Sequence, residues 1–162
     1  FQGLEFGQTT EWDADRGVTW SDLEGWEGEF HRGILACVRD LNHRYAENPS
    51  LWVLDDEPSG FSWIDANDAG HSTLSFLRTD HAGNTLACIV NFSGGPLHDY
   101  RIGLPSGGRW AEVLNTDATV YEGSGVGNLG GVLAEERGHH GRPYSATVAV
   151  GPRATVWLRH EG

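Results

Sequence analysis

The 162-residue sequence has no methionine, only two cysteines and few basic residues. Because a gene product begins with Met, we expect the chain to be a fragment of a longer protein. Cys37 and Cys88 lie in apolar periodic segments rather than at metal-ligand spacings, so we predict buried free thiols, which fit a reducing cytoplasm. The 11 basic and 23 acidic residues give a formal net charge of −12, which argues against general binding of nucleic acid or anionic lipid.

Long hydrophobic runs are also missing. No window approaches the roughly 20 consecutive apolar residues of a membrane helix, and no basic stretch leads into a hydrophobic signal core at the N-terminus. We therefore expect a soluble, cytoplasmic protein with no membrane partner. The length suits one ordinary domain, or a small domain with an appended piece.

One helix is predicted over residues 29–47. Its apolar side chains recur at gaps of three and four and form one face: Phe30, Ile34, Cys37, Val38, Leu41 and Tyr45. Asn48-Pro49 should end this helix, because the residue before proline avoids the α region and proline cannot extend the hydrogen-bond ladder inward. A short helical turn is expected at residues 50–53. The polar, glycine-punctuated residues 9–28 are predicted to form a long loop.

After Glu57 the pattern changes to the alternation that is typical of strands. The predicted strands cover residues 61–65, 71–79, 86–92, 100–104, 110–114, 144–150 and 154–159. The connecting segments 80–84, 93–96 and 105–108 contain glycine, proline, asparagine or aspartate, as turns require. Short, closely spaced strands of this kind predict an antiparallel β-sandwich of about a hundred residues.

Five runs of sequence follow one another in a distinctive order over nearly the whole chain. They are FQGLEFGQTTEWD at residues 1–13, HRGILACVRDLNHRY at 31–45, GFSWID at 60–65, NF at 91–92, and YRIGLPSGGRWAEVLNTDATVYEGSGVGN at 100–128. Together they resemble the C-terminal region of glycogen (1,4-α-glucan) branching enzymes, which belong to the α-amylase superfamily.

The resemblance implies a mainly β fold class. Residues 1–50 would be the last strand, long loop and closing helix of an α-amylase-type (β/α)8 barrel, and residues 51–162 would be a C-terminal antiparallel β-sandwich. The family's three catalytic carboxylates would all lie upstream of Phe1, so no residue of this chain is predicted to be catalytic.

The parent enzyme would transfer α-1,4-glucan segments to form α-1,6 branches, and the fragment alone would be inactive and mainly structural. The implied partners are an α-glucan such as glycogen or amylose, bound through the parent enzyme, and the upstream catalytic barrel. No cofactor is expected. Two alternatives stay open: a non-catalytic carbohydrate-binding β-sandwich with tryptophans as sugar platforms, and the C-terminal region of another α-amylase-family enzyme.

The resemblance also selects the candidate substrate-binding residues, Gln8 and Trp12. If residues 1–6 end the last barrel strand, both side chains emerge at the carboxyl end of the barrel, where the active site of such a barrel lies. Amide groups and aromatic faces suit a neutral sugar. In the alternative interpretation Gln8 forms hydrogen bonds within the loop and Trp12 packs under it. Trp20 and Trp26 are expected to be packing residues.

The run GSGVGN at residues 123–128 could present backbone N–H groups to an anion. It lacks the strand-to-helix setting and the Lys-Ser/Thr pair of a phosphate loop, so we predict an inter-strand connection. This connection would either support the barrel interface or simply turn the chain. His139-His140 has no further ligands at regular spacing, so no metal site is predicted there.

Four polar residues are predicted to have structural roles. His31, at the positive end of the helix dipole, should be neutral and either packed or hydrogen-bonded. Arg39, Asn42 and Asn115 are expected to tie the helix to the neighbouring domain through hydrogen bonds.

Overall fold

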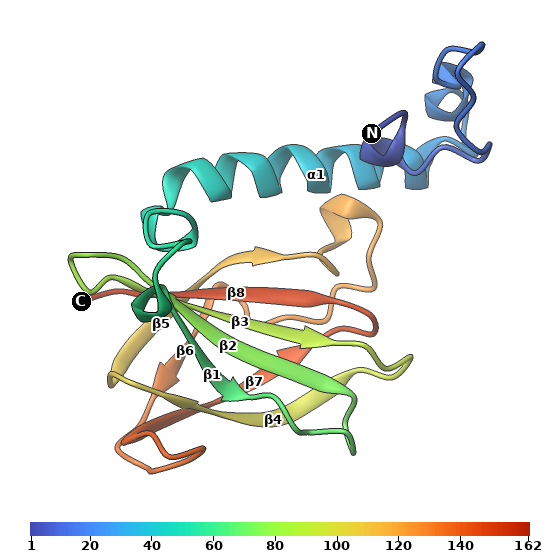
Figure 1. The fold of residues 1–162 in the computed structure, drawn as a ribbon. Coiled ribbons are helices and arrows are strands. Elements are labelled where there is room, and N and C mark those ends of the chain that lie inside the picture. The colour runs from blue at the N-terminus through green and yellow to red at the C-terminus, as the bar shows by residue number, and fades with distance from the viewer.

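The computed structural model describes residues 1–162 and contains two β-sheets, beside which a long helix runs (Figure 1). The larger sheet has six strands in the order β1-β2-β3-β8-β5-β6, and the smaller sheet pairs β4 with β7. All neighbouring strands are antiparallel. The strands are β1 (Phe61–Asp65), β2 (Thr73–Thr79), β3 (Thr85–Asn91), β4 (Leu97–Leu104), β5 (Gly108–Asn115), β6 (Gly131–Ala134), β7 (Tyr144–Val150) and β8 (Thr155–His160).

The hydrophobic core lies between these two sheets. Alternate residues of the larger sheet, such as Ile89 and Val156, meet Ile102 of β4 and Val148 of β7, and all four side chains are buried. Trp110 is fully buried among them and donates from its indole Nε1 to the carbonyl oxygen of Ser106 at 3.2 Å. Apolar burial of this kind is the main stabilising term of a sandwich. The predicted mainly β sandwich is therefore confirmed.

All seven predicted strands are present, with ends that differ from the observed ones by up to three residues, but β6 was not predicted. This strand has only four residues and begins at Gly131, whose φ is 153°. A Cβ on Gly131 would lie 2.5 Å from the carbonyl oxygen of Trp110, so the backbones of β5 and β6 approach closely here. A glycine-rich strand this short gives no alternating pattern to read.

The helix α1 (Glu29–Glu47) has the predicted bounds and ends at Asn48. A 3-10 turn, Pro49–Leu51, follows it, as expected, and leads into the sandwich. No helix of the chain is both long enough and apolar enough to cross a membrane.

Residues 1–28 form a loop segment beyond the N-terminal end of α1 (Figure 1). The strand expected at residues 1–6 is wrong for this chain, because Leu4–Phe6 forms a 3-10 turn between Gly3 and Gly7, which both have positive φ. A strand needs a neighbour for its backbone N–H and C=O groups, and the other strands of the chain all belong to the sandwich. The predicted loop at residues 9–28 is confirmed, and its only regular element is the 3-10 turn Trp20–Leu23.

Candidate functional site

The helix α1 meets the sandwich along a narrow edge that contains Gly33 and Asp40. A Cβ on Gly33 would lie 2.5 Å from the carbonyl oxygen of Tyr121, so the helix backbone touches the segment after β5 directly. Two turns later Asp40 Oδ2 accepts a hydrogen bond from the Tyr121 hydroxyl at 2.8 Å. Residues seven apart lie on the same side of a helix, so Tyr121 contacts α1 along one edge.

The apolar stripe of α1 is only partly covered, because Cys37, Val38 and Leu41 are half-buried and the other members are exposed. Phe30 is 63% exposed and Ile34 is 41% exposed, and Leu35 and Tyr45 are exposed as well. A helix normally buries such a stripe against a partner. The stripe is an unfilled contact surface of this chain.

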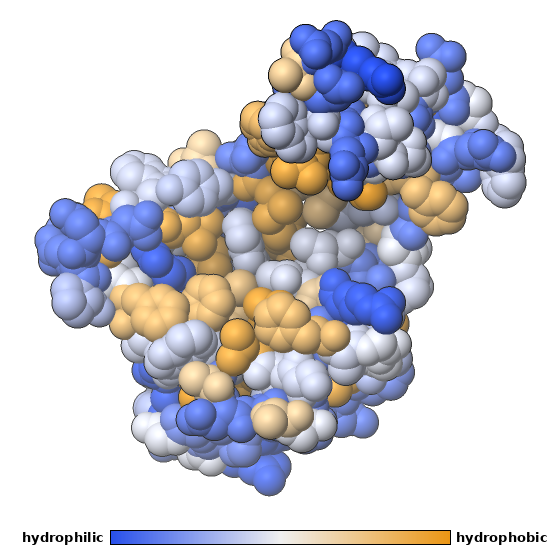
Figure 2. Space-filling view, turned by 45° about the vertical axis from the view of Figure 1, so that its right-hand side comes forward, coloured by the Kyte–Doolittle hydropathy of each residue, from blue (hydrophilic) through white to orange (hydrophobic).

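A second apolar surface lies on the outer face of the larger sheet, and we call it the outer aromatic face: Phe61, Trp63 and Phe76. The Phe61 and Phe76 rings stack with their centroids 5.3 Å apart, and Trp63 meets Phe61 edge-on at 4.9 Å. Trp63 is nevertheless 49% exposed. Figure 2 shows hydrophobic side chains on both sides of a hollow between the N-terminal part and the sheet. Contiguous exposed apolar surface of this kind marks an interaction site.

The connection between α1 and β1 is fastened to the sandwich by Arg78. Its guanidinium donates to Asp55 Oδ1 at 2.6 Å and to the carbonyl oxygen of Leu51 at 3.2 Å. Trp52 donates from Nε1 to the carbonyl oxygen of Tyr45 at 3.1 Å. The helix is thus tied to the sandwich at both of its ends.

The two predicted substrate-binding residues lie in different environments. Gln8 is engaged inside the loop, because its Nε2 donates to the carbonyl oxygen of Thr10 at 3.0 Å and its Oε1 accepts from the Thr19 backbone N–H at 3.2 Å. Trp12 is 61% exposed, makes an edge contact with Phe1 and lines a shallow hollow of about 320 Å³. Trp12 offers a free aromatic face, whereas the Gln8 amide supports the loop.

The other two loop tryptophans also differ from each other. Trp20 stacks on Phe6 with a centroid distance of 5.4 Å, as a packing residue would. Trp26 is 80% exposed, so its predicted packing role is wrong within this chain, where no side chain covers it.

The first turn of α1 holds the loop. His31 Nδ1 lies 2.9 Å from the carbonyl oxygen of Phe6, so the predicted hydrogen-bonding role is confirmed. Arg32 donates to the carbonyl oxygens of Leu23, at 2.6 Å, and Gly25, at 2.9 Å. Both ends of the loop are therefore attached to neighbouring residues of α1.

The glycine run at residues 123–128 is held by hydrogen bonds to the carboxylate of Asp117, a residue of the same chain. Asp117 accepts hydrogen bonds from the backbone N–H of Ser124 at 2.9 Å, the Ser124 hydroxyl at 2.6 Å and the backbone N–H of Val126 at 3.0 Å. These are donors that a bound phosphate would need. The run connects β5 to β6, which confirms the predicted inter-strand connection.

A second carboxylate fixes the far end of the same run. Glu112 Oε2 accepts from the backbone N–H of Asn128 at 3.0 Å and from its Nδ2 at 2.6 Å. Asn115 donates to the carbonyl oxygen of Val126 at 2.9 Å, so it holds the glycine run rather than α1. The sequence pattern did not predict the roles of Asp117 and Glu112, although an aspartate a few residues before a glycine-rich run is suited to accept hydrogen bonds from it.

The predicted tie through Arg39 and Asn42 is wrong. Arg39 pairs only with its neighbour Asp40, and Asn42 is exposed and has no side-chain partner. Both residues lie on the side of α1 that faces away from the edge between Gly33 and Asp40. Tyr121, which the sequence analysis did not select, makes the tie instead.

His139 and His140 sit on a hairpin turn beside β4. Their ring centroids are 4.0 Å apart, and His140 Nδ1 accepts from the backbone N–H of Gly103 at 3.3 Å. Burial lowers the pKa of His140, and the neighbouring His139 adds to this shift. The pair is part of the packing between this turn and β4.

Residues 63–161 match the family model for the α-amylase C-terminal all-β domain. The chain belongs to this family. It is 54% identical over 99% of its length to the 1,4-alpha-glucan branching enzyme GlgB of Rhodococcus jostii (strain RHA1), of which it covers 22%. It is 52% identical over 98% of its length to the GlgB of Mycobacterium tuberculosis (strain ATCC 25618 / H37Rv), of which it covers 21%.

The chain thus spans about a fifth of the length of the curated relatives it matches, and it corresponds to their C-terminal part. Solved structures of α-amylase-family proteins share the fold at low identity. A group B Streptococcus pullulanase, SAP, aligns over 90% of this chain and 18% of its own, with a TM-score of 0.52 and 10% identity. The A258V mutant of trehalulose synthase MutB covers 92% of this chain and 24% of its own, with a TM-score of 0.50 and 17% identity. The predicted resemblance to branching enzymes is confirmed.

Proposed function

We propose that this α-amylase C-terminal domain protein is the non-catalytic C-terminal part of a 1,4-α-glucan branching enzyme. The whole enzyme transfers α-1,4-glucan segments to form α-1,6 branches, with its catalytic carboxylates upstream of Phe1. The observation that carries this proposal is the 54% identity to the R. jostii enzyme over 99% of the chain. Transfer of this kind uses one carboxylate as nucleophile and another as acid and base.

The proposal divides the chain into residues 1–50, which complete the catalytic barrel, and residues 51–162, which form the supporting all-β domain. Two surfaces support docking of the upstream barrel: the exposed stripe of α1 and the outer aromatic face. Burial of such apolar surface contributes roughly 25 cal/mol per Å². The sandwich therefore stabilises the barrel in the intact enzyme, and the isolated chain self-associates through the same surfaces.

Trp12 is the proposed contact with α-glucan, because an exposed indole can cover the C–H face of a sugar ring. Gln8 enters the proposal as the residue that shapes the loop beneath Trp12, since both ends of its amide are occupied. The glucan is reached through the parent enzyme, and we propose no nucleic acid, membrane partner or cofactor. A cytoplasmic location is also part of the proposal, and the two free thiols support it.

An iodine-staining assay of branching on amylose tests the proposal. The full-length protein should be active, and this chain alone should be inactive; branching by the pure 162-residue chain would overturn it.

In the full-length protein, Trp12→Ala should raise the half-saturating amylose concentration about tenfold, the loss expected of one stacking contact. Trp26→Ala, at another exposed position of the same loop, is the matched control and should leave this concentration unchanged. Equal behaviour of the two variants would remove Trp12 from the proposal.

A further inference from the structure

Three consecutive residues at the start of α1 receive contacts from two different parts of the chain. His31 and Arg32 hydrogen-bond to the loop segment, at Phe6, Leu23 and Gly25. The next residue, Gly33, touches the sandwich through the backbone of Tyr121. The loop and the sandwich therefore meet at a single helical turn.

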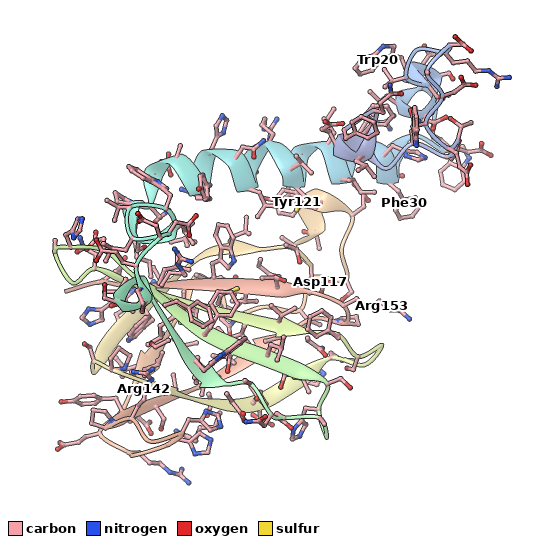
Figure 3. All side chains as sticks on the ribbon, viewed as in Figure 1. Trp20, Phe30, Asp117, Tyr121, Arg142 and Arg153 are labelled. Carbon is pink, nitrogen blue, oxygen red and sulfur yellow. The ribbon has the colours of Figure 1, made fainter.

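Tyr121 contacts α1 at two points along its length. Its carbonyl group abuts Gly33 and its hydroxyl donates to Asp40, so the residue spans about two helical turns. Burial raises the pKa of Tyr121 to about 12, and the Asp40 carboxylate contributes to that shift, so the phenol stays protonated as a donor. Figure 3 shows Tyr121 beneath α1, with Trp20 on the loop beyond the N-terminal end of the helix.

The segment that carries Tyr121 is itself firmly anchored to the sandwich. Gly123 follows two residues later, and its Cα lies so close to the backbone of Asp117 that a Cβ there would overlap the Asp117 carbonyl. The Asp117 carboxylate then closes the glycine run behind it. The position of Tyr121 is thus set by Asp117, just after the end of β5, rather than by a free loop.

We infer that Tyr121 is a positioning residue. It fixes the first turn of α1 relative to the sandwich, and through His31 and Arg32 it places residues 9–28, which carry Trp12. In a barrel of this kind the helix after the last strand begins at the face where the active site lies. The sandwich thereby reaches the catalytic face. The barrel setting and the consequence for glucan binding rest on the proposed function, whereas the placement of residues 9–28 by Tyr121 does not.

Hydrogen–deuterium exchange on the full-length protein tests the placement itself. Tyr121→Phe removes only the hydroxyl, and amide exchange in residues 9–28 should speed up about fivefold, the effect of one lost hydrogen bond. Gly33→Ala forces a Cβ against the Tyr121 carbonyl and should give a larger increase. Asp40→Asn keeps an acceptor for the hydroxyl and should restore most of the protection that Asp40→Ala removes.

The matched control is Tyr100→Phe. This change removes another hydroxyl that is bonded to a carboxylate, at 2.9 Å from Asp68 Oδ2, but within the sandwich. It should lower the melting temperature without changing exchange in residues 9–28. If Tyr121→Phe leaves exchange in residues 9–28 unchanged, or if Tyr100→Phe changes it equally, the positioning role is overturned.

Amylose kinetics on the same variants separate this inference from the proposed function. Tyr121→Phe should raise the half-saturating amylose concentration about threefold to fivefold and change kcat less than about twofold. Faster exchange with an unchanged half-saturating concentration would support the positioning role and overturn glucan binding by the loop. A fall in kcat alone would overturn the positioning of a binding loop.

Discussion

The sandwich and residues 1–47 bury their apolar side chains to very different extents. All 15 residues of the hydrophobic core cluster belong to the sandwich, from Ile64 onward. Within residues 1–47, Phe6 is the only large apolar side chain that is buried, whereas three tryptophans and half of the α1 stripe are exposed. The sandwich has its own hydrophobic core, whereas residues 1–47 do not.

The two parts of the chain therefore have different roles. In the sandwich, polar groups such as Asp117 and Glu112 have partners within the chain, so their function is structural. In the N-terminal part, exposed apolar groups and a loop attached to α1 indicate contacts with something outside the chain. Substitutions of matched residues in the two parts test this contrast.

The largest effect on the free energy of unfolding should come from replacing one tryptophan by alanine in each of the two parts. Trp110→Ala empties a fully buried site and should lower the free energy of unfolding by about 3–5 kcal/mol. Trp26→Ala removes an exposed ring and should change it by less than about 0.5 kcal/mol. Urea titration of the chain followed by circular dichroism measures both. A large loss for Trp26→Ala would mean that residues 1–47 have a core of their own.

The next largest loss of stability should come from Asp117, whose carboxylate accepts hydrogen bonds from residues 123–128. Asp117→Ala removes three hydrogen bonds and leaves the backbone N–H groups of Ser124 and Val126 without a partner, so we expect a loss of about 2–3 kcal/mol. Asp117→Asn keeps one acceptor oxygen and should lose about half as much. The same urea titration measures both variants, and equal stability of all three proteins would show that the run is held by its turns alone.

The strands of the sandwich could be predicted from the sequence because each one is marked by a pattern within a short segment of the chain. Alternation of apolar residues and turn-forming residues placed seven strands, and the 3.6-residue period placed α1 between Glu29 and Glu47. β6 escaped because a four-residue strand that starts with glycine has no alternation. The N-terminal strand failed because a strand is defined by a neighbour, which this chain does not supply.

The candidate site was harder to predict because its contacts are long-range. Gln8 and Trp12 follow each other closely in the sequence, but only the fold shows that one amide is occupied and the other side chain is free. The tie between α1 and the sandwich joins residues 81 positions apart, and no period or motif links Asp40 to Tyr121. Arg39 was predicted instead because a guanidinium can form several hydrogen bonds, but its only ion-pair partner is Asp40 on the same helix.

The two parts of the chain each contain one cysteine, and the reactivities of the two thiols should differ. Burial raises the pKa of the Cys88 thiol to about 12, while Cys37 on α1 is only partly buried and its pKa is raised less strongly. Because the thiolate is the reactive form, Cys88 should react at least about tenfold more slowly than Cys37 with iodoacetamide. Peptide mass spectrometry of the native chain measures the ratio, and urea should abolish the difference. Equal labelling without urea would contradict the burial of β3.

The smallest effect is a pH dependence in the turn between β2 and β3. Burial acts to raise the pKa of Asp80, but the hydrogen bonds from the Asn84 side chain and from the backbone of Asn84 and Ala82 outweigh it and lower the pKa. A lowered folded-state pKa gives stability that is present above the unfolded value of about 3.9 and is lost as the pH falls through the folded value.

Asp80→Asn should therefore cost about 1 kcal/mol at pH 7, and this cost should shrink below about pH 4. Urea titrations of both proteins between pH 7 and 2.5 measure the gap, with Asp15→Asn in the exposed loop as the control for loss of a charge. A gap that stayed constant to the lowest pH would show that the turn does not depend on an ionised Asp80, and the sandwich would then owe its acid sensitivity to other groups.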